Sequence, residues 1–277
     1  DSLLIQATVG CPHNKCTFCT VYKKGPRYKV RSVADIVEDL REARRLYGDC
    51  FRSIFFPAGN SIAMPAEDLA QVLQQARELF PSLERMTVYG SAKYVLEKGE
   101  QGLDRLARAG LTRIHVGLES GDDEVLASVR KGCDSRQQIE AGLMLRRAGI
   151  ENSTYVMLGI GGKARSRDHA LNTAAVVNAV QPDFVRLRTF VPKVNTALLK
   201  KVEQGRFVVL GSHEILREAR IFLENTDAST SLTSDHYSNY IDLHGRLPGD
   251  REALLRRIDA CLELDASHFR PFFVGRE

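Results

Sequence analysis

The sequence predicts an α/β fold in which parallel strands alternate with helices. Six short apolar runs have the character of buried strands, and each is followed by a segment with apolar residues at helical spacing. Repetition of this unit favours a parallel sheet with right-handed crossovers. The 277 residues, 43% hydrophobic and 27% charged, suit a globular protein with a full core. The strands are expected at residues 3–9, 53–56, 86–89, 113–118, 154–158 and 184–190.

The helices between these strands carry recognisable end signals. Ser32 is expected to cap the first helix, with Asp35 three residues later as the capping partner, and Gly48 to end it. Pro65 suits the first turn of the second helix. Further helical segments are expected near residues 101–109, 123–130, 136–148 and 167–180.

The strand–helix rhythm changes after Pro192. A helix is expected at about residues 213–224, a strand at 230–233 and a last helix from Asp250 to Leu264. No Gly/Ser-rich linker or low-complexity tract interrupts the chain. We therefore expect residues 1–192 to form the core domain and residues 193–277 to form a C-terminal α/β extension that completes its open side.

Three cysteines lie in one short loop after the first strand. Cys11, Cys16 and Cys19 are separated by four residues and then by two. Thiolates are soft ligands that suit iron–sulfur clusters and zinc. Three protein ligands on a four-coordinate centre leave one position open, and an open position is where chemistry can occur. The separate cysteines, Cys50, Cys133 and Cys261, are interpreted as small buried hydrophobic residues.

A structural zinc site is the non-enzymatic alternative for this loop. His13 lies between the first two cysteines and would be its fourth ligand. Closed zinc sites usually combine two short ligand motifs, and the sequence has no second Cys-x-x-Cys or His-x-x-x-His. An electron carrier is disfavoured as well, because no fourth cysteine follows at ferredoxin spacing.

The cysteine loop resembles the cluster-binding loop of the radical S-adenosylmethionine (SAM) superfamily. Phe18, the aromatic residue before the last cysteine, is part of this resemblance, and the four-residue first gap makes the loop a CX4CX2C variant. The resemblance implies a partial (β/α)6 barrel over about residues 3–190. It also implies that the three cysteines hold a [4Fe–4S] cluster whose open iron binds SAM, and that one-electron reduction splits SAM into methionine and a 5′-deoxyadenosyl radical.

A second block, residues 117–132, resembles the fourth strand and helix of the coproporphyrinogen dehydrogenase and methylthiotransferase branches. The resemblance implies that Glu119 contacts the SAM ribose, that Ser120 belongs to the same cofactor site, and that Lys131 meets the SAM carboxylate. Alternatively, Glu119 is an acid stabilised at a helix N-terminus, and Lys131 is a solvated lysine at a helix end.

Two glycine-containing turns complete the cofactor site that the resemblance implies. Gly59, Asn60 and Ser61 stand where the family places a second-strand motif whose backbone holds the SAM amino group; a plain strand–helix turn is the alternative. Gly159 and Gly161 follow the fifth strand, as in the family's adenine-side glycine loop.

Two arginines and one polar run are further candidates. Arg186 and Arg188 alternate on the sixth strand, and inward guanidinium groups need anionic partners, which favours contact with SAM or substrate. A salt bridge within the fold is the alternative. His236 and Tyr237 lie in the polar run 235–240 and are candidates to donate or shuttle protons; a histidine satisfied by local hydrogen bonds is the alternative.

The remaining features bound the partners and the compartment. The net charge of +4 includes no basic tract that indicates nucleic acid. No apolar run approaches the ~20 residues of a membrane helix, and no basic-then-apolar leader is present. A cysteine trio with separate cysteines elsewhere favours a reducing cytoplasm.

The expected partners are a small-molecule substrate and an electron donor such as flavodoxin or ferredoxin. A related alternative is an enzyme that breaks another C–S bond of SAM and transfers its aminocarboxypropyl group.

Overall fold

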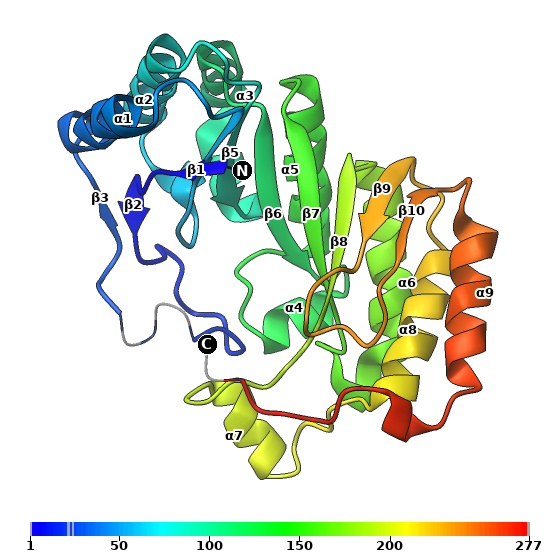
Figure 1. Ribbon diagram of the computed structural model, residues 1–277. Helices are drawn as coiled ribbons and strands as arrows, with labels where there is room; N and C mark the ends of the chain where they lie inside the picture. The colour runs from blue at the N-terminus through cyan, green and yellow to red at the C-terminus, as the bar shows by residue number, and fades with distance from the viewer. Residues whose placement is uncertain (1, 21–22, 24, 276–277) are drawn as a thin grey trace. The chain divides into compact units, whose positions relative to one another are not determined.

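The computed structural model describes residues 2–20, 23 and 25–275 (Figure 1). Within them the strands form one mostly parallel eight-stranded sheet in the order β1-β4-β5-β6-β7-β8-β9-β10, and a separate two-stranded sheet, β2-β3. This confirms the predicted α/β class with parallel strands. The strands are β1 (Ser2–Leu4), β2 (Thr8–Val9), β3 (Lys29–Val30), β4 (Ser53–Phe56), β5 (Arg85–Gly90), β6 (Arg113–Glu119), β7 (Glu151–Leu158), β8 (Phe184–Thr189), β9 (Thr230–Thr233) and β10 (His244–Leu247).

The chain divides into two compact units. Unit 1 contains Asp1–Asn14, Lys24–Gly117 and Glu140–Asn152, and unit 2 contains Lys15–Lys23, Leu118–Ile139 and Ser153–Glu277. The expected boundary at residue 192 stays a prediction.

The single strand predicted for residues 3–9 is wrong. The run forms β1, which pairs in parallel with β4, and β2, which pairs antiparallel with β3. The break occurs because the two halves bond to different partners: the Ile5 amide donates to the carbonyl of Phe55, whereas the carbonyl of Ala7 accepts from the Arg31 amide. Apolar residues continue through the break, so the pattern alone does not reveal it.

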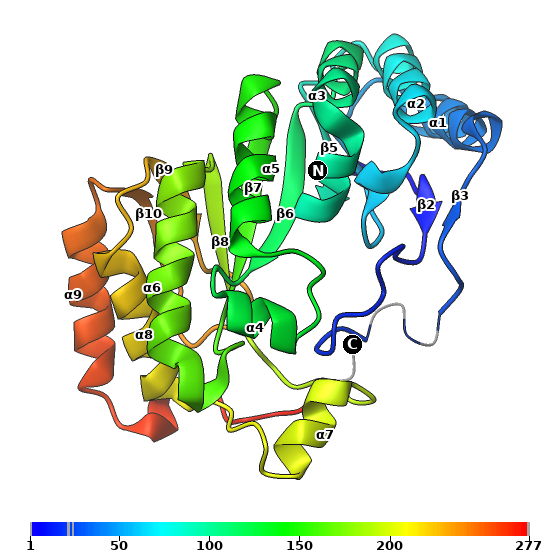
Figure 2. The same ribbon diagram turned by 180° about the vertical axis from the view of Figure 1, so that it is seen from behind.

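Unit 1 packs three helices against its strands: α1 (Val33–Tyr47), α2 (Ala66–Leu79) and α3 (Ala92–Ala109) (Figure 2). The expected ends of α1 are confirmed: the Ser32 hydroxyl accepts from the Asp35 amide at 3.1 Å, and Gly48 follows the helix with φ 65°. The helix predicted at residues 101–109 is only the second half of α3, which Gly99 interrupts with φ 65°. Because glycine is a poor helix former, Gly99 made the sequence pattern indicate a helix only after it, although the helix begins at Ala92.

Three long helices of unit 2 cover one face of its strands. Helices α6, α8 and α9 lie together against that face (Figure 1). Its apolar core includes Val156, Val185, Leu187 and Leu232, all less than 2% exposed. Alternate residues point to the opposite face and are only half-buried, so that face is where polar side chains meet the surroundings. The helices are α4 (Asp123–Ser128), α6 (Gly162–Val180), α7 (Ala197–Glu203), α8 (Ser212–Glu224) and α9 (Arg251–Leu262), and α5 (Ser135–Arg147) has residues in both units.

The region after Pro192 contains the predicted elements in the predicted order and adds helix α7 and strand β10, which were not predicted. Helix α8, strand β9 and helix α9 appear where they are expected, and β10 pairs antiparallel with β9 as an unpredicted strand. None of the helices formed by the described residues is both long enough and apolar enough to cross a membrane.

Candidate cofactor site

The first cysteine follows strand β2 through a tight glycine turn. Gly10 has φ 75°, and a side chain there would come within 2.9 Å of the Pro26 carbonyl oxygen. Its own carbonyl accepts from the Gly59 amide at 3.1 Å, which ties the start of the loop to the turn after β4. The backbone therefore holds Cys11 at a defined place in unit 1.

The Cys11 sulfur accepts hydrogen bonds as a thiolate ligand would. The Asn14 amide and the Asn60 side-chain amide each lie 3.5 Å from Sγ. Asn60 is 6% exposed, and its Oδ1 is buried without a hydrogen-bond partner. The side chain of Asn60, where the sequence implied a backbone contact, thus faces the first cysteine.

Two polar groups of the turn after β4, the Ser61 hydroxyl and the Gly59 amide, form hydrogen bonds within the protein. The Ser61 hydroxyl donates to the Phe56 carbonyl at 2.7 Å and accepts from the Tyr89 amide at 3.0 Å. The Ser61 side chain is fully buried and makes both bonds within the protein, so this hydroxyl is committed to the fold. The amide of Gly59 is committed too, through its bond to the cysteine loop.

Cys16 and Cys19 belong to unit 2, where the rest of the loop is fastened by backbone bonds. The Thr17 amide donates to the Val129 carbonyl at 2.9 Å, and the Thr17 carbonyl accepts from the Leu198 amide at 3.0 Å. All three loop cysteines are half-buried free thiols. Within residues 2–20, 23 and 25–275, no three His, Cys, Asp or Glu side chains are already gathered as metal ligands.

The expectation for the other three cysteines is wrong for Cys50, which is exposed, whereas Cys133 and Cys261 are half-buried. Cys50 lies in the loop between α1 and β4, where no apolar face covers it. Burial raises the pKa of the Cys133 thiol, against the opposing effect of Lys131.

Glu119 and Lys131 form a buried ion pair at the end of β6. The Lys131 Nζ lies 3.0 Å from Glu119 Oε1, and the two side chains are only 8% and 13% exposed. Burial disfavours the lysine charge, but Glu119, Cys16 and Cys133 outweigh it and raise the pKa of Lys131. Glu119 has φ 64°, a left-handed conformation that is strained for a non-glycine residue. The solvated lysine is therefore ruled out, and the cap of α4 is Asp122 rather than Glu119.

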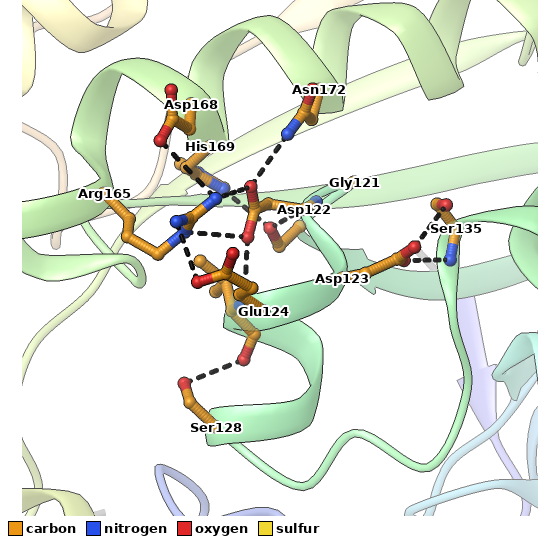
Figure 3. A network of polar contacts seen from close by, with 12 residues as sticks. Gly121, Asp122, Asp123, Glu124, Ser128, Ser135, Arg165, Asp168, His169 and Asn172 are labelled. Atoms are coloured by element: carbon orange, nitrogen blue, oxygen red, sulfur yellow. Dashed lines mark hydrogen bonds and ion pairs between the residues drawn. The ribbon is translucent and has the colours of Figure 1, made fainter.

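Asp122 anchors the turn that follows this pair (Figure 3). It caps α4 by accepting from the Val125 amide at 2.9 Å, and it is 1% exposed. Arg165 and Asn172 reach the same carboxylate from α6, at 2.8 and 2.7 Å. Burial opposes the charge on Asp122, but the bond from Arg165 and the other donors outweigh it and lower the pKa of Asp122.

Ser120 is fully buried, and its polar atoms bond within the protein. Its hydroxyl lies 2.8 Å from His169 Nδ1 and accepts from the Asp122 amide, and its carbonyl accepts from Gln138. A direct side-chain contact with a cofactor would have to replace one of these bonds. Ser120 is thus placed to hold the turn after β6, and its predicted cofactor contact stays a prediction.

The glycine loop after β7 rests on a buried carboxyl group. Gly159 has φ 80°, and its amide donates to Glu218 Oε1 of α8 at 2.6 Å. The Ser166 hydroxyl also donates to Glu218, and His169 Nε2 lies 3.5 Å from it. Burial raises the pKa of Glu218 to about 7 and lowers the pKa of His169 to about 4, so burial shifts both groups toward their neutral forms. Gly161 is the N-cap of α6.

Glu218 and His169 therefore connect two predicted cofactor segments within unit 2. Glu218 holds Gly159, and His169 lies between Glu218 and Ser120. Neither residue is among the site residues predicted from the sequence. A signal existed for Glu218: three residues after Ile215 and four before Phe222, it lies on the apolar face of its helix, where a charged residue is unusual.

Arg186 and Arg188 lie on the half-buried face of β8. Arg186 Nε donates to the Ser153 hydroxyl at 3.2 Å, and the Arg188 guanidinium lies 5.1 Å from the centre of the Tyr155 ring. Among the described residues neither arginine has a carboxylate within ion-pair distance. The salt bridge offered as the alternative reading is absent from this part of the chain.

His236 is bonded locally. Its Nδ1 lies 2.7 Å from the Ser238 hydroxyl, and its ring lies 4.2 Å from that of Tyr237, which is 67% exposed. The same hydroxyl accepts from the Thr189 amide at the end of β8. This matches the alternative of a loop histidine with local partners, while the proton-transfer roles stay predictions.

Comparison with known proteins gives one family and several relatives. Residues 5–173 match the family described as the Radical SAM superfamily. A protein of Methanocaldococcus jannaschii named as a candidate methylthiotransferase is 24% identical over 238 residues, which cover 80% of this chain and 51% of that protein. The chain thus spans about half the length of this curated relative.

Solved structures share the fold at low identity. Methylornithine synthase has a TM-score of 0.59 at 16% identity and covers 94% of this chain and 81% of its own. Coproporphyrinogen III oxidase from Escherichia coli has a TM-score of 0.58 at 17% identity, covering 82% and 52%. A methyltransferase from Kitasatospora setae, solved with cobalamin and a [4Fe–4S] cluster, has a TM-score of 0.54 at 20% identity, covering 68% and 36%.

Proposed function

The chain belongs to the radical SAM superfamily, and from this premise we propose that it is a radical SAM enzyme acting on a small-molecule substrate with electrons from a protein such as flavodoxin or ferredoxin. The observation that carries the proposal is the loop of three free cysteines within the matched residues. The cluster and SAM, when bound, supply the reductive cleavage of SAM to methionine and a 5′-deoxyadenosyl radical.

Cys11, Cys16 and Cys19 are the proposed ligands of the [4Fe–4S] cluster. The donor set suits this group, since all three are free thiols and amide donors already face the Cys11 sulfur. Asn60 supports this assignment further, because a buried amide oxygen without a partner can accept from the SAM amino group beside the cluster.

Glu119 and Lys131 are the proposed contacts to the SAM ribose and carboxylate. Each side chain holds the other in place in a nearly dry site, so a hydrogen-bond acceptor and a cation are positioned before the ligand arrives. The left-handed backbone of Glu119 is consistent with a functional constraint, since such strain concentrates at binding sites.

The remaining proposed roles follow the family's arrangement. Gly159 and Gly161 would border the adenine, with Glu218 holding the first of these amides in place. Residues 193–277 would complete the substrate side of the fold, with His236 and Tyr237 as proton donors. Tyr237 is exposed enough to reach a ligand.

Anaerobic reconstitution with iron and sulfide tests the proposal. The parent should bind about four irons per protein chain, and it should convert SAM to 5′-deoxyadenosine when a reductant is added. Cys11→Ala, Cys16→Ala and Cys19→Ala should each lose the cluster, because two thiolates do not hold it securely. The control variants Cys50→Ala, Cys133→Ala and Cys261→Ala should keep it.

Three results would contradict parts of this proposal. Stoichiometric zinc without iron would favour a structural metal site. Methylthioadenosine in place of 5′-deoxyadenosine would identify aminocarboxypropyl transfer. Loss of the cluster in the Cys133→Ala variant would show that the ligand set is wrong.

A further inference from the structure

Three neighbouring strands of unit 2 bring polar side chains into register on one face. Tyr155 of β7 is paired with Arg186 of β8, and Arg186 is paired with Thr233 of β9. One step along, Met157 is paired with Arg188. Paired residues of parallel strands point to the same side of the sheet, so both arginines share a face with these neighbours.

Among the described residues, the two guanidinium groups on this face have only neutral partners. Arg186 donates to a serine hydroxyl, and Arg188 lies over the Tyr155 ring. Elsewhere in unit 2, some partly buried arginines meet carboxylates, as Arg165 does with Asp122 and Arg220 with Asp259, whereas Arg270 bonds to the Ser238 carbonyl. In residues 2–20, 23 and 25–275 no acid does the same for Arg186 or Arg188. Two half-buried positive charges are costly without an anion.

A hydroxyl group without a hydrogen-bond partner among the described residues lies on the strand beside Arg186. The Thr233 hydroxyl oxygen, in register with Arg186, is buried and has no hydrogen-bond partner. Buried hydroxyls are nearly always paired in folded proteins. A ligand oxygen on this face could accept from the hydroxyl and from the guanidinium groups together.

We propose that Arg186, Arg188 and Thr233 form a site for an oxyanion, carboxylate or phosphate, carried by the substrate. The planar fork of arginine matches both anions through paired N–H donors, and the hydroxyl adds a second kind of donor. The Tyr155 ring supports the plane of the Arg188 guanidinium, which a lysine ammonium would not reproduce. The proposal rests on the proposed function, because it takes the substrate of that enzyme to be an anion.

SAM has a single carboxylate, and Lys131 is already its proposed partner. The pair of arginines therefore fits a different anion. If the arginines bind the substrate anion, added SAM should not compete with phosphate or acetate. If they bind the SAM carboxylate, it should compete.

The test measures binding of inorganic phosphate and acetate to the reconstituted holoenzyme by calorimetry, at constant ionic strength. The parent should bind at least one of the two anions, and the preferred one separates phosphate from carboxylate substrates. Arg186→Gln and Arg188→Gln should each weaken this binding about tenfold or more, because each removes a charged hydrogen-bond donor. The control Arg246→Gln, an exposed arginine of β10, should bind like the parent.

A second variant keeps the result interpretable if glutamine disturbs the fold. Arg188→Lys retains the charge but loses the planar fork, and it should bind more weakly than the parent while its circular dichroism is unchanged. Equal anion binding by the parent and by correctly folded arginine variants would overturn the proposal. Absence of binding of either anion to the parent would overturn it too.

Two more measurements separate this site from the cofactor proposal. Saturating SAM should leave phosphate or acetate binding intact; competition would assign the arginines to the SAM carboxylate and overturn the substrate role. Iron content and 5′-deoxyadenosine formation are measured on the same samples. If these fail while arginine-dependent anion binding persists, the radical SAM proposal is wrong and the anion site stands.

Discussion

Replacing Glu218 by glutamine should change how the stability of the protein depends on pH. Burial raises the pKa of Glu218 from 4.5 to about 7 in the folded chain. Below pH 4.5 the group is protonated in both the folded and unfolded states, so its contribution to stability is fully present there. As the pH rises through about 7 that contribution is lost, because the unfolded chain ionises the group first.

The size of this effect follows from the two pKa values. Between 4.5 and about 7 the difference corresponds to about 3 kcal/mol of unfolding free energy. Glu218→Gln cannot ionise, and it keeps an oxygen that can accept from the Gly159 amide. Relative to the variant, the parent should therefore lose up to about 3 kcal/mol between pH 4.5 and a pH above 7.

His169 acts in the opposite direction but is common to both proteins. Burial lowers its pKa from 6.5 to about 4, so its contribution is present above pH 6.5 and is lost as the pH falls through 4. The difference between parent and variant above pH 6.5 therefore reports mainly Glu218, whereas at lower pH the neighbouring His169, 3.5 Å away, also contributes.

Urea unfolding at pH 5, 6, 7 and 8, followed by circular dichroism at matched cluster content, measures the difference. Glu224→Gln on the same helix is the control, because its side chain is exposed and pairs with Arg220 at the surface. A difference between the parent and Glu218→Gln that stays constant within about 0.5 kcal/mol across this range would refute the reasoning, since surface substitutions alone produce changes of that size.

Two further predictions concern the turn after β6. Glu119→Ala should weaken SAM binding by ~1–3 kcal/mol because it leaves a ligand hydroxyl and Lys131 without their acceptor, whereas Glu119→Gln should weaken it less; equal affinities in calorimetry would remove Glu119 from the cofactor site. Asp122→Ala should lower the unfolding free energy by roughly 2–4 kcal/mol, because it removes a helix cap and the buried carboxylate that Arg165 and Asn172 both contact. Glu124→Ala, which removes the exposed partner of Arg165, should cost less than about 0.5 kcal/mol in the same urea titration.

Local patterns in the sequence were enough to predict several strands, the ends of the first helix and the loop of candidate metal ligands. Short apolar runs predicted strands such as β4 and β6, because the apolar character of a run does not depend on the strand with which it pairs. Ser32 and Gly48 marked the ends of α1, because a helix cap bonds within a few residues of itself. The cysteine spacing led to the proposed metal chemistry for the same reason, since a short loop carries all three proposed ligands.

The tertiary structure decided what depends on partners distant in the chain. The run at residues 3–9 splits because its halves bond to residues 53–55 and 29–30, and nothing inside the run records that choice. The buried contacts of His169 with Ser120 and Glu218 span 49 residues on each side, and the acceptors of Arg165 and Asn172 are likewise distant in sequence. Spacing within a sequence predicts short-range geometry, whereas the burial that shifts these pKa values exists only after separate elements have packed together.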